Sequence, residues 1–199
     1  KMLRFIVQRA NKGGNVIVES YGAENLPEQD GFVMYPNHQG LYDVLAIAGA
    51  CSRTFTVVAK KEVEHIPFLK QVFACIHALF MDRENLRQSM QVINEAADAV
   101  KEGKNVILFP EGTRSRKGNE ILEFKAGTFK SAVNAKCPIV PVALIDSFKP
   151  FDTPSIKQET VQVHFLEPIP YSQYMGLKTT EIAHLVHDRI QAKIDNQLK

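Results

Sequence analysis

The sequence predicts an α/β domain in which helices flank a central sheet of mostly parallel or mixed strands. Short apolar runs alternate with helical patterns along the 199 residues, an order typical of this class. Most of these runs are continuously apolar, as expected of strands that are covered on both faces. Hydrophobic residues make up 45% of the chain and no linker or repeat divides it, so residues 1–199 are expected to form one domain.

Seven apolar segments are predicted to form the strands. The last of them alternates apolar and polar residues, which favours a more exposed or edge strand. Because proline has no N–H to donate, Pro141 in the sixth segment predicts an edge position or a bulge near a site. In chain order the segments are Val16–Glu19, Phe32–Tyr35, Phe55–Ala59, Ala78–Met81, Val106–Phe109, Ile139–Leu144 and Val161–Phe165.

Four segments are predicted to form helices. The clearest begins after Asn85, which is placed to cap it with Gln88 as its partner, and it ends at Gly103. Its apolar residues recur every three or four positions and predict one inward face, made of Leu86, Met90, Ile93, Ala97 and Val100. The last helix is expected from about residue 180 to 197, with inward residues Ile182, Leu185, Val186, Ile190 and Ile194. Two shorter helices are expected at Asp43–Cys51 and Lys125–Ala135.

The composition excludes several classes of protein. A formal net charge of only +2 argues against nucleic acid as a partner. Cys51, Cys75 and Cys137 have no metal-ligand spacing, so we expect buried thiols in a reducing compartment and no metal site. No apolar stretch has the length of a transmembrane helix, and no signal peptide is visible. The opening residues read as an interior start or a processed chain, which leaves an upstream membrane segment open.

The first candidate site is a histidine and an aspartate in a turn that follows the second strand. His38 lies just past the end of this strand, where α/β sheets place their chemistry, and Asp43 lies near the start of the next helix. A carboxylate bonded to one imidazole nitrogen leaves the other nitrogen as a base for an alcohol. The spacing alone also fits a loop histidine beside an aspartate that favours a helix N-terminus.

The second candidate site is the turn Pro-Glu-Gly-Thr-Arg after the fifth strand. Gly112 allows the backbone to approach a ligand closely. Thr113 and Ser115 can bind an anion together with backbone N–H groups, and Arg114 can bind a phosphate with its bidentate fork. The alternative is a plain polar loop with surface arginines, which accounts less well for five such residues in succession.

A third candidate is Arg83, just before the helix that Asn85 caps. Its side chain is a candidate for the same edge of the sheet as His38 and Arg114. A local surface pair of Asp82 and Arg83 is an equal alternative.

Taken in order, these segments resemble the motifs of the glycerolipid acyltransferase family, of the 1-acylglycerol-3-phosphate acyltransferase type. That family has a histidine and an aspartate separated by four residues, a Phe-x-x-Arg segment, Phe-Pro-Glu-Gly-Thr-Arg-Ser, and an apolar strand with a proline. The counterparts are His38 and Asp43, Phe80–Arg83, Phe109–Ser115 and Ile139–Leu144, within about residues 30–145. Many relatives have serine in place of Gly40 and glycine in place of His77, which leaves the loop geometry and the acceptor preference open.

The resemblance implies a role for each candidate residue and the fold of this family. His38 is the expected base and Asp43 its orienting partner. The acceptor's glycerol phosphate is expected to contact Arg83, Glu111, Gly112, Thr113 and Arg114. Lys60 and Lys125 lie in segments that also look like those of the family, and they are further phosphate candidates.

The resemblance also implies a reaction. A fatty acyl group is expected to move from acyl-CoA or acyl carrier protein to the free hydroxyl of 1-acylglycerol 3-phosphate (lysophosphatidic acid), which gives phosphatidic acid. No cofactor is expected, and no acyl-enzyme, because the motifs contain no evident cysteine or serine nucleophile. The alternatives are another acceptor such as glycerol 3-phosphate or another lysophospholipid, a thioesterase or esterase, and a non-catalytic phospholipid-binding module, which leaves the histidine and aspartate unexplained.

The product of this reaction belongs in a bilayer, so the expected location is the cytoplasmic face of a membrane. The segment Ile66–Ile76 is a candidate for a membrane-facing or chain-binding helix, whose Lys70 is able to reach the interface. An ordinary core helix is the alternative for this segment.

Overall fold

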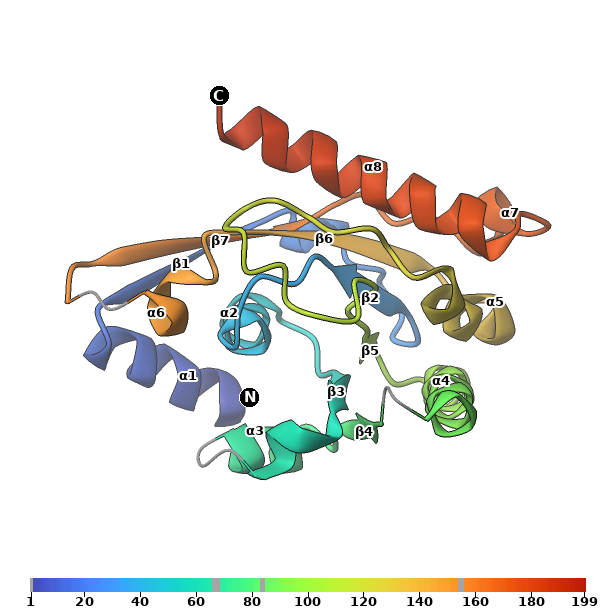
Figure 1. Ribbon diagram of the computed structural model, residues 1–199, viewed down its shortest axis with the longest axis horizontal. Coiled ribbons are helices and arrows are strands. Elements are labelled where there is room, and N and C mark those ends of the chain that lie inside the picture. The colour runs from blue at the N-terminus through green and yellow to red at the C-terminus, as the bar shows by residue number, and fades with distance from the viewer. Residues whose placement is uncertain (1, 66–68, 83–84, 154–155) are drawn as a thin grey trace.

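A seven-stranded mixed sheet runs through the middle of the molecule, and helices cover both of its faces (Figure 1). The structure is a computed structural model that describes residues 2–65, 69–82, 85–153 and 156–199. It confirms the predicted α/β class with a mixed, mainly parallel sheet. Within these ranges, no helix is long and apolar enough to cross a membrane.

Each predicted strand is present, although most of the ends are shifted. The order across the sheet is β1-β7-β6-β2-β5-β3-β4, and all neighbouring strands are parallel except β6 and β7. The carboxyl ends of β2, β3, β5 and β6 therefore meet at one edge, where α/β sheets place their sites. The bounds are β1 Val16–Tyr21, β2 Val33–Pro36, β3 Thr56–Lys60, β4 Leu79–Met81, β5 Val106–Ile107, β6 Ile139–Ile145 and β7 Glu159–Phe165.

The four predicted helices are also present. The segment predicted over residues 125–135 divides into a short 3-10 helix, η3, and the α-helix α5. The α-helices are α1 Met2–Gly13, α2 Asp43–Ala50, α3 Leu69–Cys75, α4 Leu86–Lys101, α5 Lys130–Ala135, α6 Lys149–Asp152, α7 Tyr171–Tyr174 and α8 Thr179–Gln197. The 3-10 helices are η1 Ala23–Asn25, η2 Lys61–His65 and η3 Ala126–Phe129.

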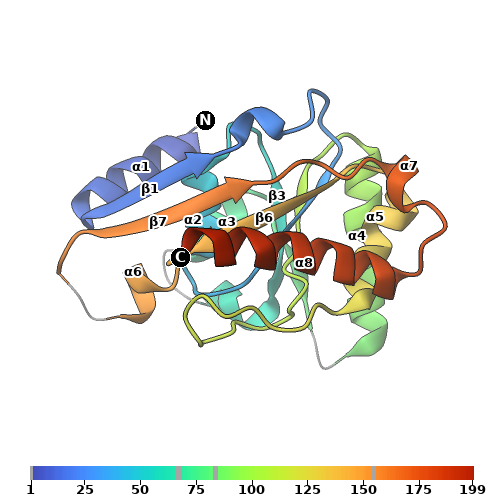
Figure 2. The same cartoon turned by 90° about the horizontal axis from the view of Figure 1, so that it is seen from above.

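Two hydrophobic clusters fill the two faces of the sheet. One contains α1 and α2, with buried residues such as Val7 and Ile47. The other contains α4, α5 and α8, with buried residues such as Ile93 and Ile190. Figure 1 shows α8 on the side of the sheet opposite α1 and α2, and Figure 2 shows it lying along β6. The sheet is thus covered on both faces, which explains why most strands are continuously apolar.

The helix α1 was not predicted. Val7 and Asn11, four positions apart, are buried, whereas the apolar Phe5 and Ile6 are exposed. The helical period is nevertheless present in the sequence, because apolar residues recur every three or four positions, at Leu3, Ile6, Val7 and Ala10. Periodicity was therefore sufficient to predict this helix, although some of its apolar side chains face outward.

The edge positions expected for two strands are wrong, whereas the alternative of a more exposed strand holds for β7, in which Glu159, Thr160 and Gln162 are only half-buried. The strand β7 is not an edge strand, because it lies between β1 and β6. Pro141 is likewise not at an edge, because β6 pairs with both β2 and β7. The ladder between β6 and β7 ends at Val142 and Phe165, so the nitrogen of Pro141 lies where regular pairing has stopped and costs no ladder bond.

The helix α4 has the predicted cap but a different inward face. The side chain of Asn85 accepts a hydrogen bond from the Gln88 N–H at 3.1 Å. The Gln88 side chain, expected as the reciprocal capping partner, instead accepts from the Asp82 N–H and donates to the Phe80 carbonyl. Leu86 and Met90, predicted to be inward, are 76% and 51% exposed. The reason is that the first half of α4 borders an apolar cavity instead of the closed core.

One of the two departures from the family pattern has a conformational consequence. His77, in the turn before β4, has a φ of 50°, in the left-handed region where glycine is favoured. This conformation accounts for the glycine that relatives carry at the position.

The three thiols lie in different environments. Cys51 and Cys137 are buried, as expected, and neither takes part in a disulfide. The expectation is wrong for Cys75, which is exposed at the end of α3.

Candidate active site

The loop that carries His38 is fastened to β6 just after β2 ends. The side chain of Asn37 donates to the Leu144 carbonyl at 3.0 Å and accepts from the Leu144 N–H at 2.7 Å. These two bonds imitate a strand pair, so the loop keeps its register with the sheet beyond the end of the strand. His38 follows directly and is thereby placed at the carboxyl edge of the sheet.

His38 and Asp43 form a hydrogen-bonded pair. His38 Nδ1 lies 2.7 Å from Asp43 Oδ2, and Asp43 is fully buried. The imidazole ring also packs against Phe109, with 4.2 Å between the ring centroids. Because Asp43 engages Nδ1, Nε2 is the nitrogen that is left to act as a base.

Asp43 is fixed by several donors besides the imidazole. The N–H groups of Gln39 and Gly40 donate to its carboxylate at 2.7 and 3.0 Å, and the hydroxyl of Ser147 also donates to it. A carboxylate has enough lone pairs for all of these donors, whereas an amide side chain does not. The carboxylate is therefore oriented before a substrate binds.

The sequence did not predict a polar network behind the pair, in which Gln39 and Ser147 are buried and Asn119 and Asp146 are half-buried. Gln39 Oε1 accepts from the Ser147 N–H at 2.9 Å and lies 3.0 Å from the Ser147 hydroxyl, whose one proton is donated to Asp43. Gln39 Nε2 donates to Asn119 Oδ1 at 2.8 Å. Asn119 in turn donates to Asp146 Oδ1 at 2.9 Å. Only Gln39 had a local signal, since it lies between the two motif residues.

Glu111 is buried, and both of its carboxylate oxygens accept from backbone N–H groups. Its side chain is 2% exposed, Oε1 accepts the His38 N–H at 2.6 Å, and Oε2 accepts the Leu122 N–H at 3.1 Å. The Ser115 N–H donates to the His38 carbonyl at 2.8 Å and adds a second bond between the two loops. This placement favours a positioning role for Glu111 over the contact with phosphate that the family resemblance implied.

Replacing Glu111 with glutamine is expected to lower kcat about tenfold, because one of the two amide donors loses its acceptor.

Burial raises the pKa of Glu111 to about 7. A raised pKa stabilises the fold at low pH, and this contribution is lost as the pH rises through about 7. The stability of the wild type relative to Glu111→Gln should therefore be greater at pH 5 than at pH 8, as measured by urea unfolding. An equal difference at both pH values would contradict this assignment.

A cavity of about 270 Å³ adjoins His38 at the carboxyl edge of the sheet. Its polar lining consists of Lys60, Thr113, Arg114, Arg116 and the imidazole, and the rest of its wall is mostly apolar, with side chains such as Leu41, Val44, Val63 and Phe73. Three cations and a hydroxyl beside a base form a suitable environment for a phosphate. Arg116 was not among the predicted residues, although it lies two positions after Arg114.

The remaining predicted residues lie elsewhere. Gly112 has a φ of 70°, and a Cβ there would lie 2.8 Å from Lys125 Nζ, so glycine suits the position. Both residues line the second, apolar cavity and not the one beside His38. Arg83 lies outside the described residues, as does the start of the predicted helix Ile66–Ile76.

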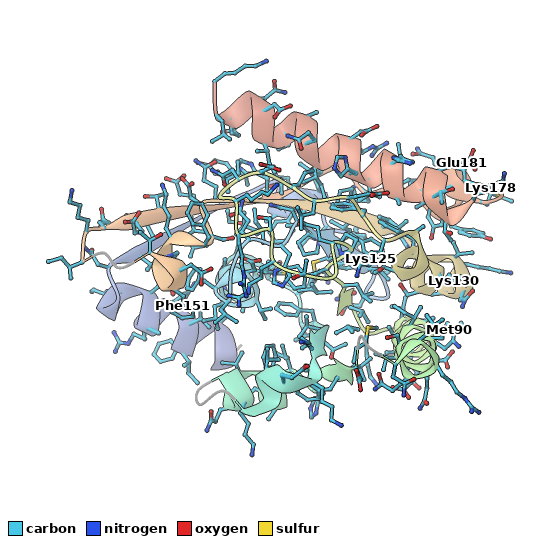
Figure 3. All side chains as sticks on the ribbon, in the orientation of Figure 1. Met90, Lys125, Lys130, Phe151, Lys178 and Glu181 are labelled. Atoms are coloured by element: carbon cyan, nitrogen blue, oxygen red, sulfur yellow. The ribbon has the colours of Figure 1, made fainter. Side chains whose placement is uncertain are left out.

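The second cavity has a volume of about 490 Å³ and is mostly apolar. It shares Val58 and Phe109 with the cavity beside His38, so the two spaces adjoin at these side chains. Figure 3 labels three residues that border it, Met90 on α4, Lys125 before η3, and Lys130 on α5. Its other lining residues include Met81, Leu86, Ile93 and Leu108.

Comparisons with known proteins agree on one family. A family model described as Acyltransferase matches residues 17–145. A 1-acyl-sn-glycerol-3-phosphate acyltransferase of Saccharomyces cerevisiae is 31% identical over 178 residues, which are 87% of this chain and 58% of that protein. One of Escherichia coli is 32% identical over 159 residues, which are 79% of this chain and 64% of that protein. The chain therefore spans about three fifths of the length of these curated relatives.

A solved structure has the same fold. The crystal structure of the 1-acyl-sn-glycerophosphate (LPA) acyltransferase PlsC from Thermotoga maritima superposes with a TM-score of 0.82. The similarity covers 98% of this chain and 78% of that one, at 24% sequence identity. It supports the arrangement of strands and helices described above.

Proposed function

This chain belongs to the acyltransferase family, and we propose that it is an enzyme that acylates 1-acylglycerol 3-phosphate. The acyl group comes from a thioester, either acyl-CoA or acyl carrier protein, and the product is phosphatidic acid. The observation that carries the proposal is the contact of 2.7 Å between His38 Nδ1 and buried Asp43, next to a cavity whose wall includes the cations Lys60, Arg114 and Arg116.

The chemistry follows from this pair. Nε2 of His38 takes the proton of the acceptor hydroxyl, and the oxygen attacks the carbonyl carbon of the thioester. The tetrahedral intermediate then expels the thiolate, which receives the proton from the imidazolium. One ester bond forms, one thioester bond breaks, and no acyl-enzyme is needed.

The three cations in the wall of the cavity beside His38 support the choice of a phosphorylated acceptor. These cations are Arg114, Arg116 and Lys60, and each can neutralise part of the charge of a phosphate. The acceptor hydroxyl is then held near His38, which lines the same space. Proximity of this kind removes much of the entropic cost of the reaction.

The apolar cavity of about 490 Å³ supports binding of the donor's acyl chain. Its side chains exclude water from a hydrocarbon chain, and Phe109 lies at its junction with the cavity beside His38. A thioester carbonyl at this junction would have its chain in the apolar space and its carbon near the imidazole.

Replacing Met90 with tryptophan is expected to shift the preferred acyl chain toward shorter lengths, because the larger ring fills part of the cavity. The ratio of kcat/KM for palmitoyl-CoA to that for lauroyl-CoA should fall about tenfold. This is the size of effect expected when a pocket loses its contact with at least one methylene group of the chain. Met175→Trp is the matched control, since Met175 is exposed and lies outside this cavity. An unchanged ratio in the Met90 variant would exclude this cavity as the chain site.

A membrane surface, at its cytoplasmic face, is the proposed place of action. The helix α1 exposes Phe5 and Ile6 by 60% and 42%, and Arg9 lies over the Phe5 ring at 5.4 Å from its centroid. An amphipathic helix with exposed apolar and basic side chains is suited to the interface of an anionic bilayer. The part of the predicted membrane-facing segment that is described, α3, carries the exposed Lys70.

Replacing both Phe5 and Ile6 with glutamate is expected to reduce binding to liposomes at least about tenfold. The reason is that burial of each apolar side chain contributes about 1.5–3 kcal/mol. Co-sedimentation with vesicles that contain phosphatidylglycerol measures the effect. The control is Leu177→Glu with Leu198→Glu, which adds the same charges at exposed positions close to the two ends of α8. Equal binding of the two double variants would refute the role of α1.

Product analysis tests the function as a whole. The purified chain is incubated with acyl-CoA or acyl carrier protein thioester and with lysophosphatidic acid, glycerol 3-phosphate or other lysophospholipids, and the lipids are identified by mass spectrometry. Phosphatidic acid from lysophosphatidic acid is the expected product. Thioester consumption that needs no acceptor would indicate a thioesterase, and the absence of any turnover would contradict the enzymatic proposal.

A further inference from the structure

Arg114 makes an ion pair beside the cavity that contains His38. Its Nη1 lies 3.4 Å from Oδ1 of Asp152, the last residue of α6, and the two side chains are 26% and 34% exposed. This distance is longer than the roughly 2.7–2.9 Å of a strong charge-assisted hydrogen bond. The Asp152 carboxylate therefore binds the Arg114 guanidinium only weakly.

Asp152 lies against the backbone of the loop that carries His38. A Cβ on Gly40 would lie only 2.9 Å from Asp152 Oδ2 and 2.9 Å from Phe148 Cα, so the glycine leaves the room that this carboxylate fills. Phe151, labelled in Figure 3, packs edge-on against the ring of Tyr42, with 5.4 Å between the centroids. The helix α6 is thus packed against the loop that carries the catalytic pair.

We propose that Asp152 determines the headgroup specificity of the acceptor, by competing with it for Arg114. An acceptor that carries a phosphate monoester displaces this carboxylate, and an acceptor whose phosphate is esterified a second time does so poorly. Asp152 acts on Arg114 and is a specificity-determining residue, with no part in proton transfer. The inference rests on the proposed function and specifies its acceptor.

The two classes of acceptor differ in the charge that they bring to Arg114. A phosphate monoester has a charge of about −1.5 to −2 at pH 7 and three acceptor oxygens, whereas a phosphodiester has one negative charge. Arg116 and Lys60 line the same cavity as Arg114, so the charge of a monoester is attracted by three cations. A phosphodiester, with its single negative charge, gains about half of that attraction. It must still displace Asp152 from Arg114, as the monoester does. Selection against one class of ligand through a competing contact is an established route to specificity.

The test compares Asp152→Asn with the wild type on two acceptors that have the same acyl chain, lysophosphatidic acid and lysophosphatidylglycerol. The ratio of their kcat/KM values is expected to fall about tenfold in the variant, through a lower KM for the phosphodiester at unchanged kcat. Inorganic phosphate should also inhibit the variant several-fold more strongly. Asp152→Glu should keep the selectivity of the wild type. Asp98→Asn is the matched control, since Asp98 makes an exposed ion pair with Lys101 at 2.9 Å, on the distant end of α4.

The outcomes separate this inference from the function on which it rests. If the wild type does not acylate lysophosphatidic acid, the proposed function itself fails. If the wild type does so and Asp152→Asn keeps the ratio, the specificity role of Asp152 is refuted. A uniform rise in KM for both acceptors would also refute it, because it would show that Asp152 only supports Arg114. Adding Arg114→Gln should abolish the effect of Asp152→Asn on the ratio, and an effect that persists would exclude competition for Arg114.

Discussion

Replacing His38 with asparagine is expected to lower kcat for acyl transfer by a factor of about 10²–10⁴, the usual contribution of a general base. Asparagine has no group that accepts a proton at neutral pH, so the acceptor hydroxyl must react without deprotonation. The KM values should change little, since the cations and the apolar cavity are untouched. The measurement is the steady-state rate of phosphatidic acid formation from lysophosphatidic acid and acyl-CoA.

The matched control for this prediction is His187→Asn. His187 lies on α8, where its ring packs against Phe124, and α8 covers the face of the sheet opposite α2. Thermal unfolding of both variants would identify a loss of fold. A His38 variant that is folded and has the kcat of the wild type would show that another group is the base.

Replacing Asp43 with asparagine is expected to lower kcat by a similar factor of about 10²–10⁴ and also to destabilise the fold. The carboxylate orients His38 and accepts from the backbone of Gln39 and Gly40. An asparagine has one acceptor oxygen, so its NH₂ group would face a backbone donor. One unsatisfied buried donor costs about 1–3 kcal/mol, and the imidazole would no longer be held in the required tautomer.

Two measurements test this prediction, the kcat of Asp43→Asn and its free energy of unfolding in urea. Ser147→Ala serves as the comparison, because it removes a single donor and leaves the carboxylate in place. It should lower kcat much less than Asp43→Asn does. If Asp43→Asn kept most of its kcat, the orienting role would be refuted even if stability fell.

Local patterns in the sequence are sufficient to predict most of the fold. Buried strands are short apolar runs, and a cap such as Asn85 marks a helix start within a few residues of the helix itself. The errors arise where tertiary context decides which face is covered. Leu86 and Met90 follow the helical period, yet they border a cavity, and no pattern in the sequence distinguishes a cavity wall from a core.

The candidate site was predictable only in part, for a related reason. His38 and Asp43 are five positions apart, so a turn is enough to bring them together. Glu111 reaches the His38 N–H across 73 positions and Ser147 reaches Asp43 across 104. Such contacts depend on the order of the strands, which the apolar runs do not specify. The family motif drew attention to Glu111, but only the geometry indicates that its carboxylate binds backbone amides.

The ties between the His38 loop and its neighbours have a consequence for how the protein loses activity. Asn37 joins this loop to β6, Glu111 joins it to the turn after β5, and Ser147 joins Asp43 to the chain beyond β6. The loop that carries His38 therefore cannot move unless its bonds to these neighbouring segments break. The catalytic geometry belongs to the same cooperative unit as the central strands, so heat or denaturant should abolish catalysis and unfold the sheet in one transition.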